Sequence, residues 1–378
     1  MAEPQTFERR GIVEGFFGPP WSMAHRKALF EFGAARGMNT YLYAPKDDPY
    51  HRERWTQPYP RKQWKALLGL IEHAQQQRID FVYGFHPGKG LRFSAAGPIR
   101  TLLTKARPFY DAGVRTFAVL FDDIPSRLEH DADQKHFSKS LARAEGSWLQ
   151  AIQEKQPSAW QDIEWWICPS YYTPDPTLAR VFGAFEPNFL ETLAEYLPPN
   201  AACFWTGPAV VPKKITLSHL QKVVKRLKHR LLLWDNYPVN DLTMRDELHI
   251  GPLEGRDSRL PQAVHGYFNN PLVQEDLSFV PLATCFDYAA NPRTYRAEPS
   301  WTRIIGQRFG SGTLSRWRAI RKFCEASQRS KKTKRSLRLS PIERRQLAAA
   351  IVYLDAQRNE KWRREIRPWR DLMQNALR

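Results

Sequence analysis

Apolar residues occur along this chain in short runs, separated by longer stretches in which apolar and polar positions alternate with helical spacing. The runs are rich in β-branched and aromatic residues, which is typical of strands. Eight runs stand out: "GIVEGFFG" (11–18), "NTYLYAP" (39–45), "DFVYGFHPG" (80–88), "RTFAVLFDD" (115–123), "IEWWICPS" (163–170), "AACFWTGP" (201–208), "RLLLWDN" (230–236) and "VHGYFNNP" (264–271). Because they are almost continuously apolar, they predict strands buried on both faces, as in a parallel sheet.

The stretches between these runs predict amphipathic helices, for example "RKQWKALLGLIEHAQQQR" (61–78) and "LSHLQKVVKRLKHR" (217–230). Eight strand–helix units in a chain of this length fit an α/β fold of the (β/α)8, or TIM-type, barrel class better than an open sheet. The first strand is not followed by a G-x-G-x-x-G pattern, which argues against a dinucleotide-binding fold. We therefore predict a catalytic-type barrel over residues 1–295.

The pattern changes at about residue 296, where strand-like runs end. Residues 315–327 predict one helix, and residues 341–366 predict a second that begins with Ser340 as N-cap and Pro341 as its first residue. The intervening "RSKKTKR" (329–335) is predicted to be an exposed connection. Residues 296–378 are thus expected to form a basic, helical C-terminal segment.

The positive charge of the chain is concentrated in this C-terminal segment. The formal net charge is +18, and residues 301–378 hold 21 Lys and Arg against 6 Asp and Glu, which leaves only +3 for the first 300 residues. A solvated helical face explains such a run of charge, and an acidic partner is the alternative. Since the segment lacks a nucleic-acid-binding motif, nucleic acid is not the expected partner.

The four cysteines, Cys168, Cys203, Cys285 and Cys324, are not arranged as C-x-x-C, and three lie among apolar residues. They are expected to be buried thiols in a reducing compartment. The N-terminus lacks the apolar core of a secretory signal, and no apolar run is long enough to span a bilayer. The sequence therefore predicts a cytoplasmic protein without a membrane partner, and gives no signal for an oligomeric state.

The chemistry of a barrel of this kind is built where the strands end. The residues at these positions are carboxylates, amides, hydroxyls and aromatics, together with Lys46 and His86. Such a ring suits a neutral, polyhydroxylated ligand. Zinc-type clusters of Cys and His, a Gly-rich phosphate loop and a G-x-S-x-G elbow are all missing from the sequence, so no metal or other cofactor is expected. His86 alone predicts a structural side chain.

The most informative strand end is "VLFDDIPS" (119–126), where Asp122 and Asp123 are adjacent. Two aspartates here can be simple turn or helix-cap residues. Alternatively, two carboxyls in a partly desolvated pocket cannot ionise equally easily, so that one stays protonated and can act as an acid while the other stays anionic. That division of labour suits glycoside hydrolysis. It requires the strand to end or twist at Asp122, since adjacent strand residues point to opposite faces.

Several longer motifs support the second interpretation. "GIVEGFFGPPW", "NTYLYAPKDDPYHRERW", "FAVLFDDI", "WTGPAVV" and "LLLWDNYPVND" resemble glycoside hydrolase family 84, the β-N-acetylglucosaminidases that include protein O-GlcNAcases. The likeness runs from about Arg10 to Asn291. It implies a (β/α)8 barrel and retaining, substrate-assisted hydrolysis of terminal β-linked N-acetylglucosamine (GlcNAc), a mechanism that departs from the usual two-carboxylate scheme.

The resemblance also implies roles for individual residues. Asp122 would orient the 2-acetamido group and stabilise the oxazoline intermediate, and Asp123 would be the general acid and then the general base. The implied substrate contacts are Gly15 and Lys46 for sugar hydroxyls, Tyr172 for the acetamido oxygen, Thr206 and Val210 in the acetamido pocket, Trp234 as a wall, Asn236 near the acetamido group, and Asp241 and Asn270 for hydroxyls.

Three positions depart from the family pattern. Phe17 stands where a Tyr is usual, "CPSYY" places Tyr171 where a Glu is usual, and Ala290 lies near a position that often holds Trp. We expect these changes to affect the preference for the aglycone, the group released, more than the chemistry. The expected partner is a GlcNAc-bearing glycan or glycoprotein. The alternatives are a hexosaminidase directed at hyaluronan or another oligosaccharide, and a non-catalytic GlcNAc-binding barrel.

Overall fold

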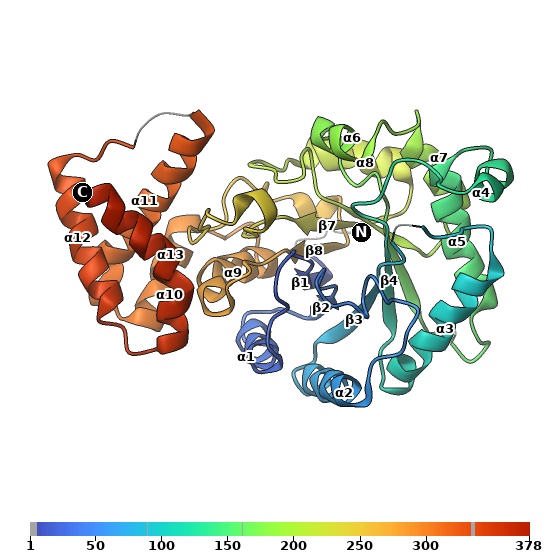
Figure 1. The fold of residues 1–378 in the computed structure, drawn as a ribbon, viewed down its shortest axis with the longest axis horizontal. Coiled ribbons are helices and arrows are strands. Elements are labelled where there is room, and N and C mark those ends of the chain that lie inside the picture. Colours follow the sequence, from blue (N-terminus) through green and yellow to red (C-terminus); the bar gives the residue numbers. More distant parts are fainter. Residues whose placement is uncertain (1–5, 89, 161, 334–336) are drawn as a thin grey trace.

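A computed structural model describes residues 6–88, 90–160, 162–333 and 337–378 (Figure 1). Eight strands pair in parallel, each with the next along the chain, and β8 pairs with β1 to close the barrel. The strands are β1 (Arg9–Glu14), β2 (Thr40–Tyr43), β3 (Asp80–Phe85), β4 (Thr116–Leu120), β5 (Glu164–Cys168), β6 (Ala202–Trp205), β7 (Arg230–Asp235) and β8 (Gly266–Asn269).

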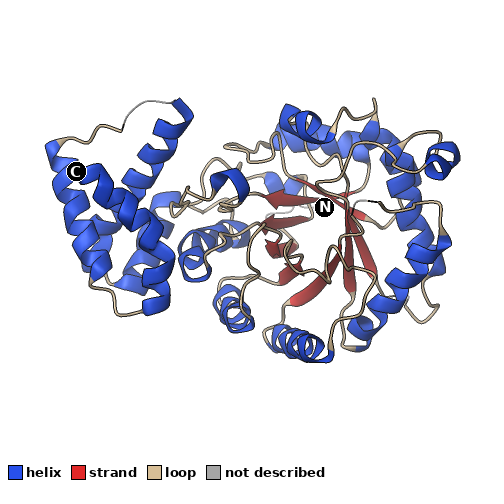
Figure 2. Ribbon diagram, in the orientation of Figure 1, coloured by secondary structure: helices blue, strands red, loops and turns tan. Residues whose placement is uncertain are grey.

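Helices surround this barrel, as Figure 2 shows by colour. They are α1 (Met23–Ala34), α2 (Arg61–Gln76), α3 (Ala96–Asp111), α4 (Asp131–His136), α5 (Leu141–Lys155), α6 (Pro176–Phe182), α7 (Phe189–Tyr196), α8 (Leu217–Leu227) and α9 (Glu275–Ala290), with short 3-10 turns at Leu242–Met244 and Leu260–Gln262. All eight predicted strands and the (β/α)8 class are confirmed.

The alternation of side chains along each strand produces two apolar layers. Val13, Leu42, Val82 and Leu120 point inward with their counterparts on the other strands and fill the barrel. The neighbouring positions, such as Tyr41, point outward and pack against the helices. Burial on both faces explains why the strands are recognisable as continuous apolar runs. A filled interior leaves the strand ends as the place for a site.

The C-terminal helices form a bundle beside the barrel: α10 (Ala297–Phe309), a 3-10 turn (Ser311–Thr313), α11 (Leu314–Thr333), α12 (Pro341–Asp355) and α13 (Glu360–Leu377). In Figure 1 this bundle lies next to α9. The two share an apolar core that includes Leu277 and Val280 of α9 and Trp301, Trp317 and Trp362 of the bundle. Burial of these large side chains fixes the bundle against the barrel.

Two predictions for this region were wrong. Residues 341–366 are not one helix, because α12 ends at Asp355 and α13 begins at Glu360. The N-cap of α13 is Asn359, whose side chain accepts a hydrogen bond from the amide of Trp362 (3.0 Å). The predicted connection at 329–335 is helical as far as Thr333, since α11 continues there, while 334 and 335 lie outside the described residues. Basic residues are favourable in the last turn of a helix, which helps α11 to extend.

The start of α12 is as predicted, with Ser340 and Glu343 forming a reciprocal capping box around Pro341. All four cysteines are buried and unpaired. Within the described ranges, the helices are too short or too polar to cross a bilayer.

Candidate active site

The turn after β4 brings Asp122 and Asp123 to the same side. The strand ends at Leu120, and Asp123 adopts a left-handed backbone conformation with φ of 63°. This departure from extended backbone removes the alternation that would otherwise separate the two side chains. The ring of buried His86 contacts the carbonyl oxygen of Asp122 through Nε2 (2.9 Å) and so holds the turn. His86 is therefore structural, as its sequence context indicates.

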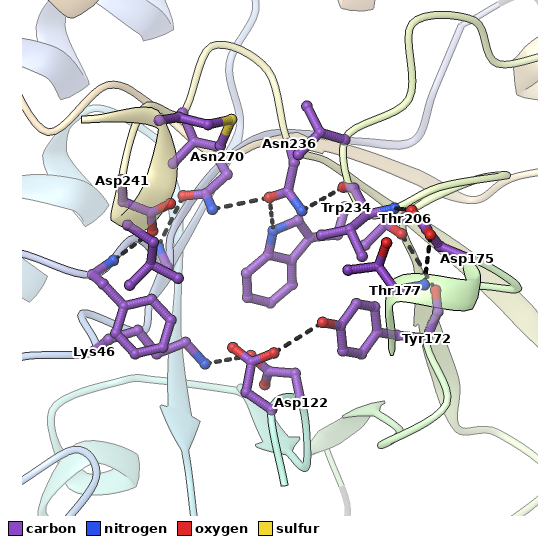
Figure 3. A pocket seen from close by; sticks show the side chains of 18 of the residues that line it. Lys46, Asp122, Tyr172, Asp175, Thr177, Thr206, Trp234, Asn236, Asp241 and Asn270 are labelled. Carbon is purple, nitrogen blue, oxygen red and sulfur yellow. Dashed lines mark hydrogen bonds and ion pairs between the residues drawn. The ribbon is translucent and has the colours of Figure 1, made fainter. Parts of the chain in front are cut away.

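A cavity of 470 Å³ opens over this turn at the carboxyl ends of the strands (Figure 3). Its size is that of a small-molecule site. All eleven residues singled out from the sequence line it: Gly15, Lys46, Asp122, Asp123, Tyr172, Thr206, Val210, Trp234, Asn236, Asp241 and Asn270. They come from the ends of seven different strands or the loops that follow them, so the closed barrel is what brings them together.

Asp122 is poised to be an anion. Burial alone would raise the pKa of its carboxyl, but the Lys46 ammonium forms an ion pair with Oδ2 and brings that pKa below its ordinary value. The other oxygen, Oδ1, is buried and has no hydrogen-bond partner among the described residues. A buried anionic acceptor without a donor is costly unless a ligand supplies one. Asp122 therefore offers a place for an incoming N–H or O–H group.

Asp123 is shifted in the opposite direction. Burial raises the pKa of its carboxyl, and the neighbouring Asp122 anion raises it further, while Lys46 and the hydrogen bond from Tyr172 only partly offset this. The Tyr172 hydroxyl donates to Oδ1 of Asp123 (2.9 Å). Burial followed by the charge of Asp123 raises the pKa of Tyr172, so its hydroxyl stays protonated. The pair thus contains one carboxyl suited to be an anion and one suited to carry a proton.

The wall opposite the aspartates is a chain of amides around an indole. Asn236 Oδ1 accepts hydrogen bonds from Trp234 Nε1 and from Asn270 Nδ2, each 3.0 Å long. Asn270 in turn accepts from the amide of Gly15 (3.3 Å). A Cβ at Gly15 would lie 2.4 Å from the Trp234 ring, so only glycine allows this close approach. The network fixes the indole face toward the cavity.

Three further contacts join distant loops at the rim. Asp241 accepts a hydrogen bond from the amide of Phe17 (2.7 Å), and burial is the main reason why the pKa of Asp241 is raised. Val210 donates its amide to Asp175 (3.1 Å) and accepts from Asn236 Nδ2 (2.8 Å). These contacts hold the walls of the cavity in place before any ligand binds.

Several residues that line the cavity were not predicted from the sequence. Asp175 caps α6 through the amide of Thr177 (2.9 Å) and also reaches the loop that holds Val210. Thr177, Val181 and Leu242 complete the mouth. The Asp-Pro pair at 175 and 176 is a helix-start signal that could have indicated the cap, but its bridge to a loop 35 residues away could not be read locally.

The three family departures do not share a location. Phe17 lines the cavity, with Lys46 Nζ 5.8 Å and the Arg52 guanidinium 5.1 Å from its ring centre. Tyr171 packs instead among Phe185, Phe189 and Trp205, outside the cavity lining. Ala290 ends α9 next to Gly37, also away from the cavity. Of the three departures, only Phe17 thus lines the cavity, and the expected effects on the aglycone stay predictions.

Within the described ranges, no three His, Cys, Asp or Glu side chains gather in an arrangement that could hold a metal ion.

Comparisons with known proteins agree with this geometry. Residues 10–325 match the model of the β-N-acetylglucosaminidase family. Protein O-GlcNAcases of Mus musculus and Rattus norvegicus are each 35% identical over 276 residues, which is 72% of this chain and 29% of theirs. This chain thus spans under a third of the length of those relatives.

A solved structure is also similar to this chain. It is that of an O-GlcNAc hydrolase mutant (Asp→Asn) from Thermobaculum terrenum, with a TM-score of 0.85 and 32% identity, and the match covers 98% of this chain and 82% of that one. The chain belongs to the β-N-acetylglucosaminidase family of glycoside hydrolases.

Proposed function

We propose that this protein is a retaining exo-β-N-acetylglucosaminidase that removes O-linked GlcNAc from proteins through an oxazoline intermediate. The observation that carries the proposal is the buried, unpartnered Oδ1 of Asp122, a carboxyl whose pKa Lys46 lowers, beside the Asp123 carboxyl, whose pKa burial raises. A 2-acetamido N–H is a donor that fits this acceptor. The names of the relatives, protein O-GlcNAcase and O-GlcNAc hydrolase, support a GlcNAc-bearing protein as substrate.

The first step is ring closure on the substrate. Asp122 accepts the acetamido N–H, which aims the amide oxygen at C1 and increases its electron density. The C1–O bond to the aglycone breaks as the amide oxygen bonds to C1, and Asp123 gives its proton to the departing oxygen. The resulting oxazolinium cation is stabilised by the adjacent Asp122 anion. Trp234 and the amides of Asn236 and Asn270 hold the sugar in position.

The second step reverses these roles. Asp123, now ionised, removes a proton from a water molecule that attacks C1 from the side vacated by the aglycone. The oxazoline opens, the acetamido group is restored, and the sugar is released with its original anomeric configuration. Two inversions at C1 account for this retention. Lys46 keeps Asp122 anionic throughout, because its ammonium forms the ion pair at Oδ2.

Substrates with different leaving groups test the assignment. Asp123→Asn should lower kcat/KM by about 10²- to 10⁴-fold for a serine-linked GlcNAc, because no group protonates the poor leaving oxygen, and should affect a nitrophenyl glycoside much less. Asp122→Asn should impair both substrates, because ring closure itself slows. If Asp122→Asn spared the nitrophenyl glycoside while Asp123→Asn did not, the two roles would be exchanged.

A substrate panel tests the protein-directed part of the proposal. The wild-type enzyme should hydrolyse a GlcNAc-serine glycopeptide faster than a chitin or hyaluronan oligosaccharide with the same terminal sugar. Preference for an oligosaccharide would contradict it, and tight binding of an N-acetylglucosamine thiazoline without turnover of any substrate would indicate a non-catalytic barrel. Buried, unpaired thiols in the described chain favour action in a reducing compartment such as the cytoplasm.

A further inference from the structure

We call the 470 Å³ cavity over the aspartates the sugar pocket. A second cavity, of 520 Å³, lies beside it, between the barrel rim and the C-terminal bundle. We call it the rim groove. Its walls are the loop after β6 (Val211–Lys213), the segment from Asn236 to Arg256 after β7, and one face of α11 from Arg321 to Lys332. Val211, Asn236 and Met244 line both the rim groove and the sugar pocket. The two cavities therefore adjoin, and an aglycone that extends from the sugar pocket on this side would reach the groove.

The two walls of the groove are held together by contacts between barrel and bundle. Trp301 Nε1 donates to the carbonyl of Ile250 (2.7 Å), and Trp369 Nε1 donates to that of Asp246 (3.0 Å). Lys331 of α11 forms an ion pair with Asp246 (2.9 Å). Because buried indoles and their hydrogen bonds fix the loop to α10 and α13, the groove is a preformed surface.

The charge along the groove is unevenly compensated. Arg256 is paired with Asp235 (2.6 Å), and Arg321 is paired with Glu254, Glu298 and Glu325. Lys213 and Arg329, by contrast, are exposed and make no ion pair within the described part of the chain. Lys332 lies 3.6 Å from Glu247, with 61% of its side chain exposed. Carboxylates thus gather around Arg321, whereas Lys213 and Arg329 stand on opposite walls of the groove without an ion-pair partner among the described residues.

Exposed apolar side chains stand at the mouth of the sugar pocket beside this junction. Val211 and Leu242 are exposed at 42% and 51%, and both line the sugar pocket at its mouth. Exposed large apolar side chains that gather at the edge of a cavity are typical of contact surfaces. The occupant must therefore combine an apolar portion close to the sugar with negative charge farther out.

The aromatic content of the groove argues against a second sugar there. Tyr237 is the one aromatic ring, apart from that of His249, among the described residues that line it. The two rings are stacked on each other, and the Arg256 guanidinium covers Tyr237 at 5.9 Å. The groove thus lacks an open aromatic platform of the kind that Trp234 gives the sugar pocket, whereas an extended peptide needs only a channel with side-chain complementarity.

We infer that the rim groove binds an acidic segment of polypeptide next to the glycosylated residue, and that Lys213 and Arg329 select for it. The inference rests on the proposed protein-directed function and adds a preference within it. Exposed charges mainly set specificity and association rate rather than large affinities. The preference is expected in KM and in salt dependence more than in kcat.

Matched glycopeptides test the inference. Each carries one GlcNAc-serine, with four Asp residues on its N-terminal side, four on its C-terminal side, or Asn in all these places. The wild-type enzyme should show a higher kcat/KM for at least one acidic peptide than for the Asn peptide. Lys213→Gln combined with Arg329→Gln should reduce that ratio about three- to tenfold, the effect of two exposed charge contacts. Raising the salt from about 0.05 M to 0.5 M should also erase the preference.

The control replaces two exposed cations far from the groove, Arg61→Gln and Lys62→Gln at the start of α2, and should leave the ratio unchanged. Equal rates on the acidic and Asn peptides would overturn the inference while leaving the protein-directed function standing. Turnover of a nitrophenyl glycoside without turnover of any glycopeptide would overturn both. If the double variant lost activity on a glucuronate-containing oligosaccharide instead of the acidic peptides, the groove would serve an anionic glycan, and the peptide assignment would be wrong.

Discussion

Two pairs of adjacent aspartates follow strands of this barrel, and they differ in what their oxygens contact. Asp47 and Asp48 come after β2, and Asp122 and Asp123 come after β4. Asp48 is buried, and both of its oxygens are satisfied: Oδ2 accepts from the hydroxyls of Tyr43 (2.6 Å) and Tyr59 (2.7 Å), and Oδ1 accepts from the amide of Tyr50 (2.9 Å). Asp47 is exposed to solvent.

The pair after β4 is organised in the opposite way. One oxygen of Asp122 forms an ion pair with Lys46, and the other is buried without a hydrogen-bond donor among the described residues. Asp123 has a strained, left-handed backbone conformation, and burial raises the pKa of its carboxyl. Two identical dipeptides at equivalent places in one fold thus differ in whether their acceptors are filled. We propose that the pair with the unfilled acceptor inside the cavity is the functional pair and that the pair with filled acceptors is the structural pair.

The largest expected difference between the pairs is in turnover. Asp122→Asn should lower kcat/KM on a nitrophenyl N-acetylglucosaminide by about 10²- to 10³-fold, because the developing oxazolinium charge loses its anionic partner. Asp47→Asn is the matched control, and should leave kcat/KM within about twofold because its side chain is solvated. Steady-state kinetics with circular dichroism of each variant gives the comparison. Equal losses of kcat/KM in the two variants would mean that an unfilled hydrogen-bond acceptor does not identify the catalytic pair.

The next difference is in stability, and here the structural pair should be the sensitive one. Asp48→Asn replaces one acceptor with an amide donor that faces the hydroxyls of Tyr43 and Tyr59, or loses the amide of Tyr50 if the side chain flips. Either arrangement should reduce the free energy of unfolding by about 1–3 kcal/mol. Urea unfolding measures the change, with Asp47→Asn as reference, expected within about 0.5 kcal/mol of the wild type. An unchanged urea midpoint for Asp48→Asn would contradict the view that the Asp48 carboxylate stabilises the fold.

The strands and the residues at their ends could be predicted from the sequence. The eight strands were predictable because burial on both faces leaves continuous apolar runs. The residues that line the cavity were predictable because all barrel strands have their carboxyl ends on the same side. The break before Asn359 was missed because α12 and α13 carry a similar apolar spacing across it. The end of α11 at Thr333 was missed because a run of charges resembles a loop even where Lys331 and Lys332 find acidic partners in the barrel.

For the site, the sequence indicates which residues gather at the rim but not their electrostatics. The left-handed conformation of Asp123 and the free oxygen of Asp122 depend on contacts with His86 and Lys46, which lie 36 and 76 residues away along the chain. Tyr171 and Tyr172 are adjacent in the sequence, and only the fold places one in an aromatic cluster and the other against Asp123. Long-range packing therefore decides which of the two tyrosines contacts the carboxyl pair.

A smaller effect concerns the stability of the functional pair. A raised pKa in the folded state means that Asp123 binds its proton more tightly when folded, so its contribution to stability falls as the pH rises above the unfolded-state value of about 3.9. Asp123→Asn removes that penalty and keeps a residue type that tolerates φ of 63°. Thermal or urea unfolding at pH 7 should show a gain of about 0.5–2 kcal/mol that disappears near pH 4.

The gain is specific to asparagine. Asp123→Ala also removes the charge but places a residue in left-handed backbone at a cost of about 1–2 kcal/mol, so it should gain less or lose stability. A gain for Asp123→Asn that stayed constant from pH 4 to pH 8 would show that the carboxyl is not held protonated by its surroundings. The proton-donor role would then need another explanation.

The smallest effect separates the two adjacent tyrosines. The Tyr172 hydroxyl donates to Oδ1 of Asp123 and so lowers the pKa of that carboxyl, partly offsetting burial. Tyr172→Phe should therefore raise the pKa of Asp123, and the alkaline limb of the kcat/KM profile, which reports the protonated acid of the free enzyme, should move to higher pH. Tyr171→Phe removes a hydroxyl from a ring packed against Phe185 and Trp205, and should leave the alkaline limb in place.

Two outcomes would show that the alkaline limb does not belong to Asp123. One is a displacement to lower pH in Tyr172→Phe, and the other is an equal displacement to higher pH in both variants. Because the rate itself is expected to fall in Tyr172→Phe through lost contact with the acetamido group, the position of the limb, and not its height, is the decisive measurement.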